Sequence, residues 1–297
     1  MGNHVPLSPL RSRYRQSHFP IMMNPATEQQ TSMHPLDAAI QLSALEPGHW
    51  NGHTSPAYGN MVGPFGGVTA AVLLNAAWIS PERLGEPVAL TVNFAGPIAD
   101  GPFTIHTRIL RTNRTTQHWS MELVQGPKVG ASASAVFATK RDTWAATDAR
   151  FPTIGATTER DPPIGSVRWT SAYHMRFAQS QPPSVASDPY DRASVSTLWL
   201  RDEPPRPLDF VSLAALCDAF YPRIFVRRPQ RVPIGTVTLT TYFHADVAAL
   251  AQQGARAVLG TARALHFGNG YFDQTAEVWS DQKALLATSH QMVYFKE

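Results

Sequence analysis

The residues that could act as nucleophiles or metal ligands in this chain lack the patterns that those chemistries require. The only cysteine, Cys217, precedes Asp218, but adjacent helix residues point in different directions and a lone cysteine is usually a buried apolar residue. The segment Gly130–Ser134 lacks the closing glycine of a G-x-S-x-G elbow. The 11 histidines have no ligand spacing, and no phosphate-binding glycine loop is present. We therefore predict no covalent nucleophile, no metal site and no cofactor.

The charged residues favour a small anionic ligand over a polyanion. The 297 residues include 25 basic and 22 acidic ones, a formal charge of +3, which is too small a surplus to indicate nucleic-acid binding. Only four of the basic residues are lysine, and arginine suits fixed, bidentate contacts to anions. Four arginines lie in one predicted loop, at Arg223, Arg227, Arg228 and Arg231. The alternative interpretation is a solvated charged loop.

The chain predicts a helix followed by four strands, twice. In the first half, Gly66–Ile79 is an apolar helix that Pro81 ends, and it is too short to span a membrane. An earlier strand is expected around His49–Tyr58, and four follow the helix, at Pro87–Pro97, Pro102–Leu110, Gln117–Gln125 and Val129–Thr139. The second half predicts a helix over Leu208–Tyr221 and strands at Ser166–Arg176, Arg192–Leu200, Ile234–His244, Ala255–Phe267, Tyr271–Ser280 and Leu285–Phe295.

The repeat is visible in the residues as well as in the order of elements. Leu90–Phe94 (LTVNF) aligns with Leu239–Phe243 (LTTYF), and Ala131–Ala135 (ASASA) aligns with Ala287–Gln291 (ATSHQ). A helix that is apolar on all sides is buried when an antiparallel sheet curls around it, which is the hotdog architecture. Edge strands of two such units can pair. We predict an α+β double hotdog, with two helix-wrapped antiparallel sheets fused into one continuous sheet.

Composition sets the expected boundaries. Residues 1–33 are rich in Pro, Ser and Arg, with Glu28 as the first acid, and we expect a disordered tail. A targeting peptide and an upstream start codon are the alternatives. We expect the first hotdog at 34–142, a linker rich in Thr, Pro and charge at 143–165, and the second hotdog at 166–297.

With these elements assigned, four segments resemble a known family. Pro64–Ala71 (PFGGVTAA) resembles the first hotdog of the double-hotdog acyl-CoA thioesterases, the TesB-like or type II enzymes. The second half is similar to that family at Leu213–Asp218, Gly235–His244 and Leu286–Met292, and the resemblance covers about Leu36 to Lys296. It implies hydrolysis of an acyl-CoA thioester to a free carboxylic acid and CoA. We also expect a role in fatty acid metabolism, a cytoplasmic location and a homodimer that pairs through sheet edges.

The resemblance also implies a catalytic set. The family holds a water on an Asp near the end of the second helix, a Thr on the next strand and a Gln on the last strand, which correspond to Asp218, Thr236 and Gln291. The aspartate would act as general base while the other two orient the water. Because strand residues alternate in direction, Thr238 and Thr240 are expected on the same face as Thr236, so the hydroxyl could belong to any of the three.

The expected substrate contacts come from two segments. Backbone N–H groups at Gly66 and Gly67, where a helix begins, are suited to a carbonyl oxygen. The guanidinium groups of Arg223, Arg227 and Arg228 are suited to the phosphates of coenzyme A.

Comparison of the two halves places the polar set in one of them. Where the second half has Asp218 and Gln291, the first has Ala76, or a close neighbour, and Ala135. We therefore expect the second hotdog to be catalytic and the first to shape the acyl channel. Two other functions on the same fold stay open: a non-catalytic acyl-CoA-binding protein, and a dehydratase or hydratase. The latter is disfavoured because no helical Asp is followed by a His about five residues later.

Overall fold

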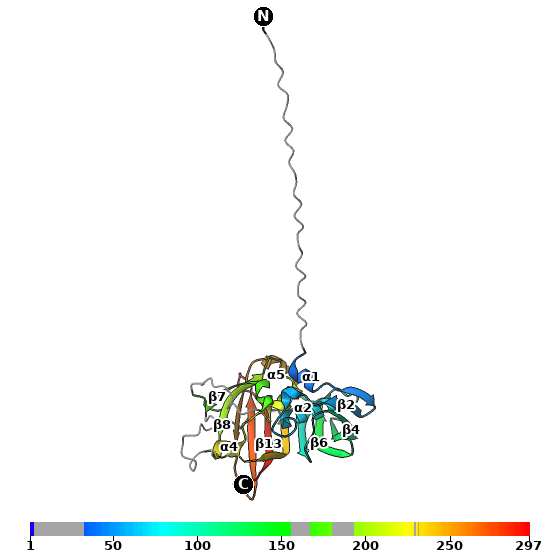
Figure 1. Cartoon of the computed structure of the whole chain (residues 1–297), viewed down its shortest axis with the longest axis vertical. Coiled ribbons are helices and arrows are strands. Elements are labelled where there is room, and N and C mark those ends of the chain that lie inside the picture. Colours follow the sequence, from blue (N-terminus) through cyan, green and yellow to red (C-terminus); the bar gives the residue numbers. More distant parts are fainter. Residues whose placement is uncertain (3–32, 156–166, 180–192, 229, 231) are drawn as a thin grey trace. The chain divides into compact units, whose positions relative to one another are not determined.

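The computed structural model describes residues 1–2, 33–155, 167–179, 193–228, 230 and 232–297 (Figure 1). The predicted tail lies almost wholly outside these residues, as do the last part of the predicted linker and Arg231. Residues Met33–Glu297 form one compact unit.

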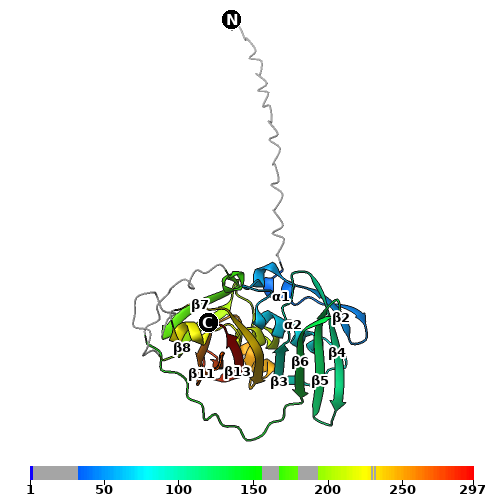
Figure 2. The same cartoon turned by 60° about the horizontal axis from the view of Figure 1, so that its bottom comes forward.

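One antiparallel sheet of thirteen strands runs through the described residues (Figures 1 and 2). Its first half contains β1 (Ser43–Glu46), β2 (His49–His53), β3 (Glu86–Phe94), β4 (Pro102–Thr112), β5 (Thr116–Gln125) and β6 (Lys128–Ala138). Its second half contains β7 (Tyr173–Gln179), β8 (Ser196–Asp202), β9 (Ile234–Phe243), β10 (Val258–Arg263), β11 (Phe267–Gly268), β12 (Tyr271–Trp279) and β13 (Leu285–Phe295). The order is β1-β2-β4-β5-β6-β3-β9-β13-β12-β10-β8-β7, and β11 pairs with β12.

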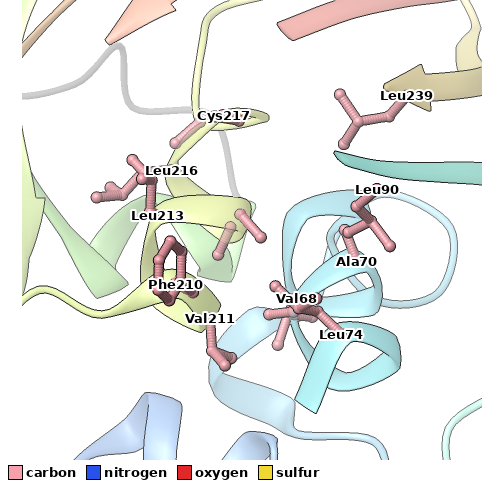
Figure 3. Packing of buried hydrophobic residues seen from close by; sticks show 14 of the residues in the cluster. Val68, Ala70, Leu74, Leu90, Phe210, Val211, Leu213, Leu216, Cys217 and Leu239 are labelled. Atoms are coloured by element: carbon pink, nitrogen blue, oxygen red, sulfur yellow. The ribbon is translucent and has the colours of Figure 1, made fainter. Parts of the chain in front are cut away.

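Two central helices, α2 (Gly66–Trp78) and α3 (Phe210–Leu216), pack against each other on the inner face of this sheet (Figure 3). Every residue of α2 from Gly67 to Ala77 is buried, which explains why the helix is apolar on all sides. At the start of α3, Asp209 and Ser212 form a reciprocal capping box. The smaller helices are α1 (Pro35–Ala39), α4 (Arg223–Arg227) and α5 (Val247–Gln253). The continuous sheet around paired helices confirms the double hotdog.

Strand register confirms the internal repeat. From each outer edge inward, the two halves have the same order of equivalent strands, and they meet where β3 pairs antiparallel with β9. At that seam Thr91 lies opposite Thr240, 149 residues later, and their hydroxyl oxygens are 3.0 Å apart. Leu90 lies opposite Ala135 in its half, and Leu239 lies opposite Gln291 in the other. Ala135 and Gln291 therefore occupy equivalent positions.

Several predicted boundaries are wrong. The second helix was expected to reach Tyr221 but ends at Leu216, so Asp218 lies in the following turn. The strand expected from Ser166 begins only at Tyr173, because the 3₁₀ helix Arg168–Ala172 precedes it. The predicted arginine loop instead contains the helix α4. The predicted strand Ala255–Phe267 divides into β10 and β11. Among the described residues, no helix is long and apolar enough to cross a bilayer.

Candidate functional site

A cavity of about 250 Å³ opens beside the start of α2 and the inner faces of β9, β12 and β13. Its wall is largely aromatic and aliphatic, and it includes the parallel ring stack of Phe65 on Trp169, with ring centroids 4.3 Å apart. Its polar side chains include four from the second half, Asp218, Thr236, Gln274 and Gln291. Residues from the first half, Phe65 and Gly66 among them, complete the wall. An apolar cavity with a few converging polar groups is typical of a small-molecule site.

Asp218 is the titratable group at the centre of this site. Its side chain is buried, and its Oδ1 accepts a hydrogen bond of 2.7 Å from the Gln291 amide nitrogen. The backbone N–H of Gly67 donates to the same carboxylate. Burial raises the pKa of Asp218 to about 7, although the bonds from Gln291 and Gly67 act in the opposite direction. A carboxylate that titrates near neutral pH beside a cavity is suited to accept a proton.

The two glycines at the start of α2 permit this contact between the halves. A Cβ atom on Gly66 would lie 2.7 Å from Asp218 Oδ2, and one on Gly67 would lie 2.5 Å from the carbonyl oxygen of Ala215. The helix can therefore approach the turn after α3 only without side chains here. The expectation for Gly67 is corrected, because its N–H bonds to Asp218. Gly66 does line the cavity.

A β-bulge in β9 separates the three candidate threonines. Thr238 lies opposite Met292, but Thr236 lies opposite Val293, the next residue of β13, so Val237 is an extra residue on β9. The bulge reverses the alternation of side chains. Thr236 consequently lines the cavity, while Thr238 and Thr240 are on the outer face with the exposed Tyr242. The expectation that all three share one face is wrong.

The comparisons with known proteins agree with this architecture. Residues 55–138 match the acyl-CoA thioesterase N-terminal domain, and residues 147–295 match the acyl-CoA thioesterase C-terminal domain. The chain belongs to the acyl-CoA thioesterase family. In this acyl-CoA thioesterase family member, the first matched segment contains strands of the first half of the sheet, and the second contains strands of the second half.

Solved structures show the same fold. A conserved hot dog-fold protein of unknown function from Alicyclobacillus acidocaldarius is 43% identical, with a TM-score of 0.83 over 89% of this chain and 99% of that chain. The tesB protein of Mycobacterium avium subsp. paratuberculosis is 15% identical, with a TM-score of 0.71 over 88% and 98% of the two chains. The acyl-CoA thioesterase II TesB2 of Mycobacterium marinum is 18% identical, with a TM-score of 0.67 over 88% and 96%. No curated protein sequence is significantly similar to the chain.

The three arginines that were predicted to bind phosphate, Arg223, Arg227 and Arg228, do not share one environment. Arg223 is fully buried, and its guanidinium donates to Gln274 Oε1, to Ser196 Oγ and to several backbone carbonyl groups. This burial contradicts the prediction that Arg223 contacts a phosphate. Burial also lowers the pKa of Arg223 to about 9. Arg228 forms an ion pair of 2.6 Å with Glu297, and Arg227 lies in the last turn of α4.

Gln274 is the site residue that sequence reasoning missed. It is buried on β12, directly opposite Gln291 on β13. The alternation of the strand could have revealed it, because Phe272, Ala276 and Val278 are buried at every second position of β12 and Gln274 falls on the same inward-facing set. A glutamine on that inward phase indicates either a structural bond or a ligand contact. In the described residues no group of three or more His, Cys, Asp or Glu side chains could hold a metal ion.

Proposed function

We propose that this protein is an acyl-CoA thioesterase that hydrolyses its substrate with a water activated by Asp218. The observation that carries the proposal is the meeting of Asp218, Gln291 and Thr236 at one apolar cavity. Membership of the acyl-CoA thioesterase family supports the substrate class. The aromatic and aliphatic wall suits an acyl group.

The chemistry requires one water and no covalent enzyme intermediate. The Asp218 carboxylate accepts a proton from the water as the water oxygen bonds to the thioester carbonyl carbon. Gln291 donates its amide N–H to Asp218, so its Oε1 is left to accept a hydrogen bond from the water, and the Thr236 hydroxyl offers a second contact. When the carbon–sulfur bond breaks, the proton on Asp218 passes to the departing thiolate. The products are a carboxylic acid and free CoA.

The remaining parts of the proposal concern organisation. The first hotdog, 34–142, shapes the acyl channel through Phe65 and Gly66, and the second, 166–297, supplies the catalytic groups. Arg227 and Arg228 serve the coenzyme A phosphates, which is supported by the position of Phe225, from the same helix, in the cavity wall. Strands β1 and β7 end the sheet and offer edges for a cytoplasmic homodimer.

The test is release of free thiol from short, medium, long and aromatic acyl-CoA thioesters. We expect turnover with at least one, and a fall in kcat of about 10²- to 10⁴-fold in Asp218→Asn, which is the usual contribution of general base catalysis. Asp202→Asn is the matched control, since Asp202 is also buried but is not among the cavity-lining residues that the structure describes. Binding of acyl-CoA without thiol release would instead indicate a non-catalytic binding protein. Full activity in Asp218→Asn would refute the assigned base.

A further inference from the structure

The buried Arg223 and the cavity-lining Gln274 form a pair that the proposed mechanism does not use. Arg223 Nε donates to Gln274 Oε1 at 3.1 Å. The same guanidinium is anchored by Ser196 Oγ at 2.7 Å and by the carbonyl oxygens of Ser194 and Ala262 at 2.9 and 3.0 Å. Among the described residues, every acceptor of Arg223 is a neutral group. The pair therefore fixes the side chain of Gln274 without neutralising the arginine.

This bond decides which way the Gln274 amide faces. A guanidinium has only donors, so the oxygen of Gln274 must be the branch of the amide that faces Arg223, and its NH₂ group is the other branch. In the described part of the chain, the side chain of Gln274 makes no hydrogen bond other than the one to Arg223. Because Gln274 also lines the cavity, its N–H donors are left for a ligand.

The two glutamines are consequently oriented in opposite senses. The amide nitrogen of Gln291 donates a hydrogen bond to the Asp218 carboxylate. Its amide oxygen is therefore left for a ligand, and an oxygen of this kind can only accept. Gln274, directly across the strand pair, presents only donors. A water that attacks a thioester needs acceptors for its protons, and the carbonyl oxygen under attack needs donors as it gains negative charge. The paired glutamines supply one of each.

We propose that Gln274 is a further catalytic residue, which donates a hydrogen bond to the thioester carbonyl oxygen, and that Arg223 is the positioning residue that orients it. This inference rests on the proposed thioesterase function. As water adds to the carbonyl carbon, the carbonyl π electrons move to oxygen and the N–H of Gln274 stabilises that charge. When the carbon–sulfur bond breaks, those electrons return to the carbonyl and the hydrogen bond weakens. Gln274 neither gains nor loses a proton.

Two substitutions separate this role from a structural one. Gln274→Met keeps the volume and removes the donors. Gln274→Glu keeps an acceptor for Arg223, and as a carboxylate it offers the buried cation an ion pair, but it cannot donate to a carbonyl oxygen. We expect both variants to lose kcat by about 10²- to 10³-fold, as for one oxyanion donor, with KM changed much less. We expect the melting temperature of Gln274→Glu to be no lower than that of the wild type.

The role of Arg223 is tested by a double-mutant cycle. Arg223→Lys should lower kcat in the wild-type background and have no further effect in the Gln274→Met background, because both changes act on the same contact. A purely structural arginine would give losses of rate that add. Melting temperatures of all four proteins establish that the folded enzymes are being compared.

A spectroscopic measurement reads the contact without turnover. In a non-hydrolysable acyl-CoA ketone, a CH₂ group replaces the sulfur and the carbonyl carbon is ¹³C. When the ketone binds to the wild type or to Asp218→Asn, we expect its carbonyl stretch to lie at lower frequency than in the free ketone. When it binds to Gln274→Glu, we expect no such shift. If both Gln274 variants turn over substrate at the wild-type rate, or if the carbonyl stretch of the ketone is shifted in both of them as it is in the wild type, this inference alone is overturned. A wild type without thiol release overturns the proposed function and this inference together.

Discussion

At the scale of single residues, two buried aspartates have similarly raised pKa values but differ in their position relative to the cavity. Asp218 and Asp202 both have pKa values that burial raises to about 7. Asp218 lines the cavity and is bonded by Gln291, whereas Asp202 lies at the end of β8 with an Oδ1 that has no partner in the described structure. The raised pKa is therefore a result of burial in both, and only position supports the catalytic role that we propose for Asp218.

This difference predicts the pH dependence of activity. If ionised Asp218 is the base, kcat/KM should rise about tenfold per pH unit on the acid side and level off above a midpoint near pH 7. Thiol release measured between about pH 5 and pH 9, roughly two pH units on each side of that pKa, checks this. Asp202→Asn should leave the midpoint in place. A midpoint that disappears in Asp202→Asn, or a rate independent of pH, would contradict the assignment.

The same aspartates give stability a definite pH trend. Their folded-state pKa values lie above the 3.8 that is usual for an aspartate in an unfolded chain, so the native state binds the protons more tightly than the unfolded chain. Their contribution to stability is complete below the unfolded pKa and is lost as the pH rises through about 7. The melting temperature of Asp202→Asn should therefore fall less than that of the wild type between acid and neutral pH.

At the scale of elements, the bulge in β9 selects which threonine serves the cavity. Val237 is the extra residue, and it places Thr236 on the inner face and Thr238 on the outer face. Both residues are threonines on the same strand, so Thr236→Val and Thr238→Val are a matched pair. We expect the first to lower kcat about tenfold, the value of a hydrogen bond of roughly 1.4 kcal/mol, and the second to leave it unchanged. Steady-state kinetics would refute this if Thr238→Val caused the larger loss.

The elements also show what the sequence could and could not predict. The helix at Gly66 and nearly all strands of the sheet followed from apolar runs, prolines and turn residues, and β13 has the predicted bounds. The bulge could not be predicted, since it depends on pairing with β13. The burial of Arg223 was missed because charge outweighed its apolar neighbours Ile224 and Val226, which are also buried. The strand alternation could have indicated that Gln274 points inward, but the orientation of its amide could not be predicted, because it depends on that arginine.

At the scale of the whole molecule, the site depends on both halves of the chain. Gly67 from the first half bonds to the carboxylate of Asp218 from the second. The halves share the β3–β9 ladder and the packed pair α2 and α3 (Figure 3). Asp218 and Gln291 therefore come from one half of the chain, and the glycines that contact Asp218 come from the other.

This interdependence predicts that the halves stay together when the chain between them is cut. Residues Arg141–Arg150 are exposed and have no helix or strand, so a protease recognition site between Ala146 and Thr147 should be accessible without disturbing the fold. After cleavage, we expect both pieces to elute together in size-exclusion chromatography and to keep thiol release. The contact between α2 and α3 that joins the halves is buried and largely apolar, so high salt should not separate the pieces, whereas denaturant should. Two separate peaks, or loss of activity on cleavage alone, would show that the covalent link rather than the shared sheet and helix pair holds the site together.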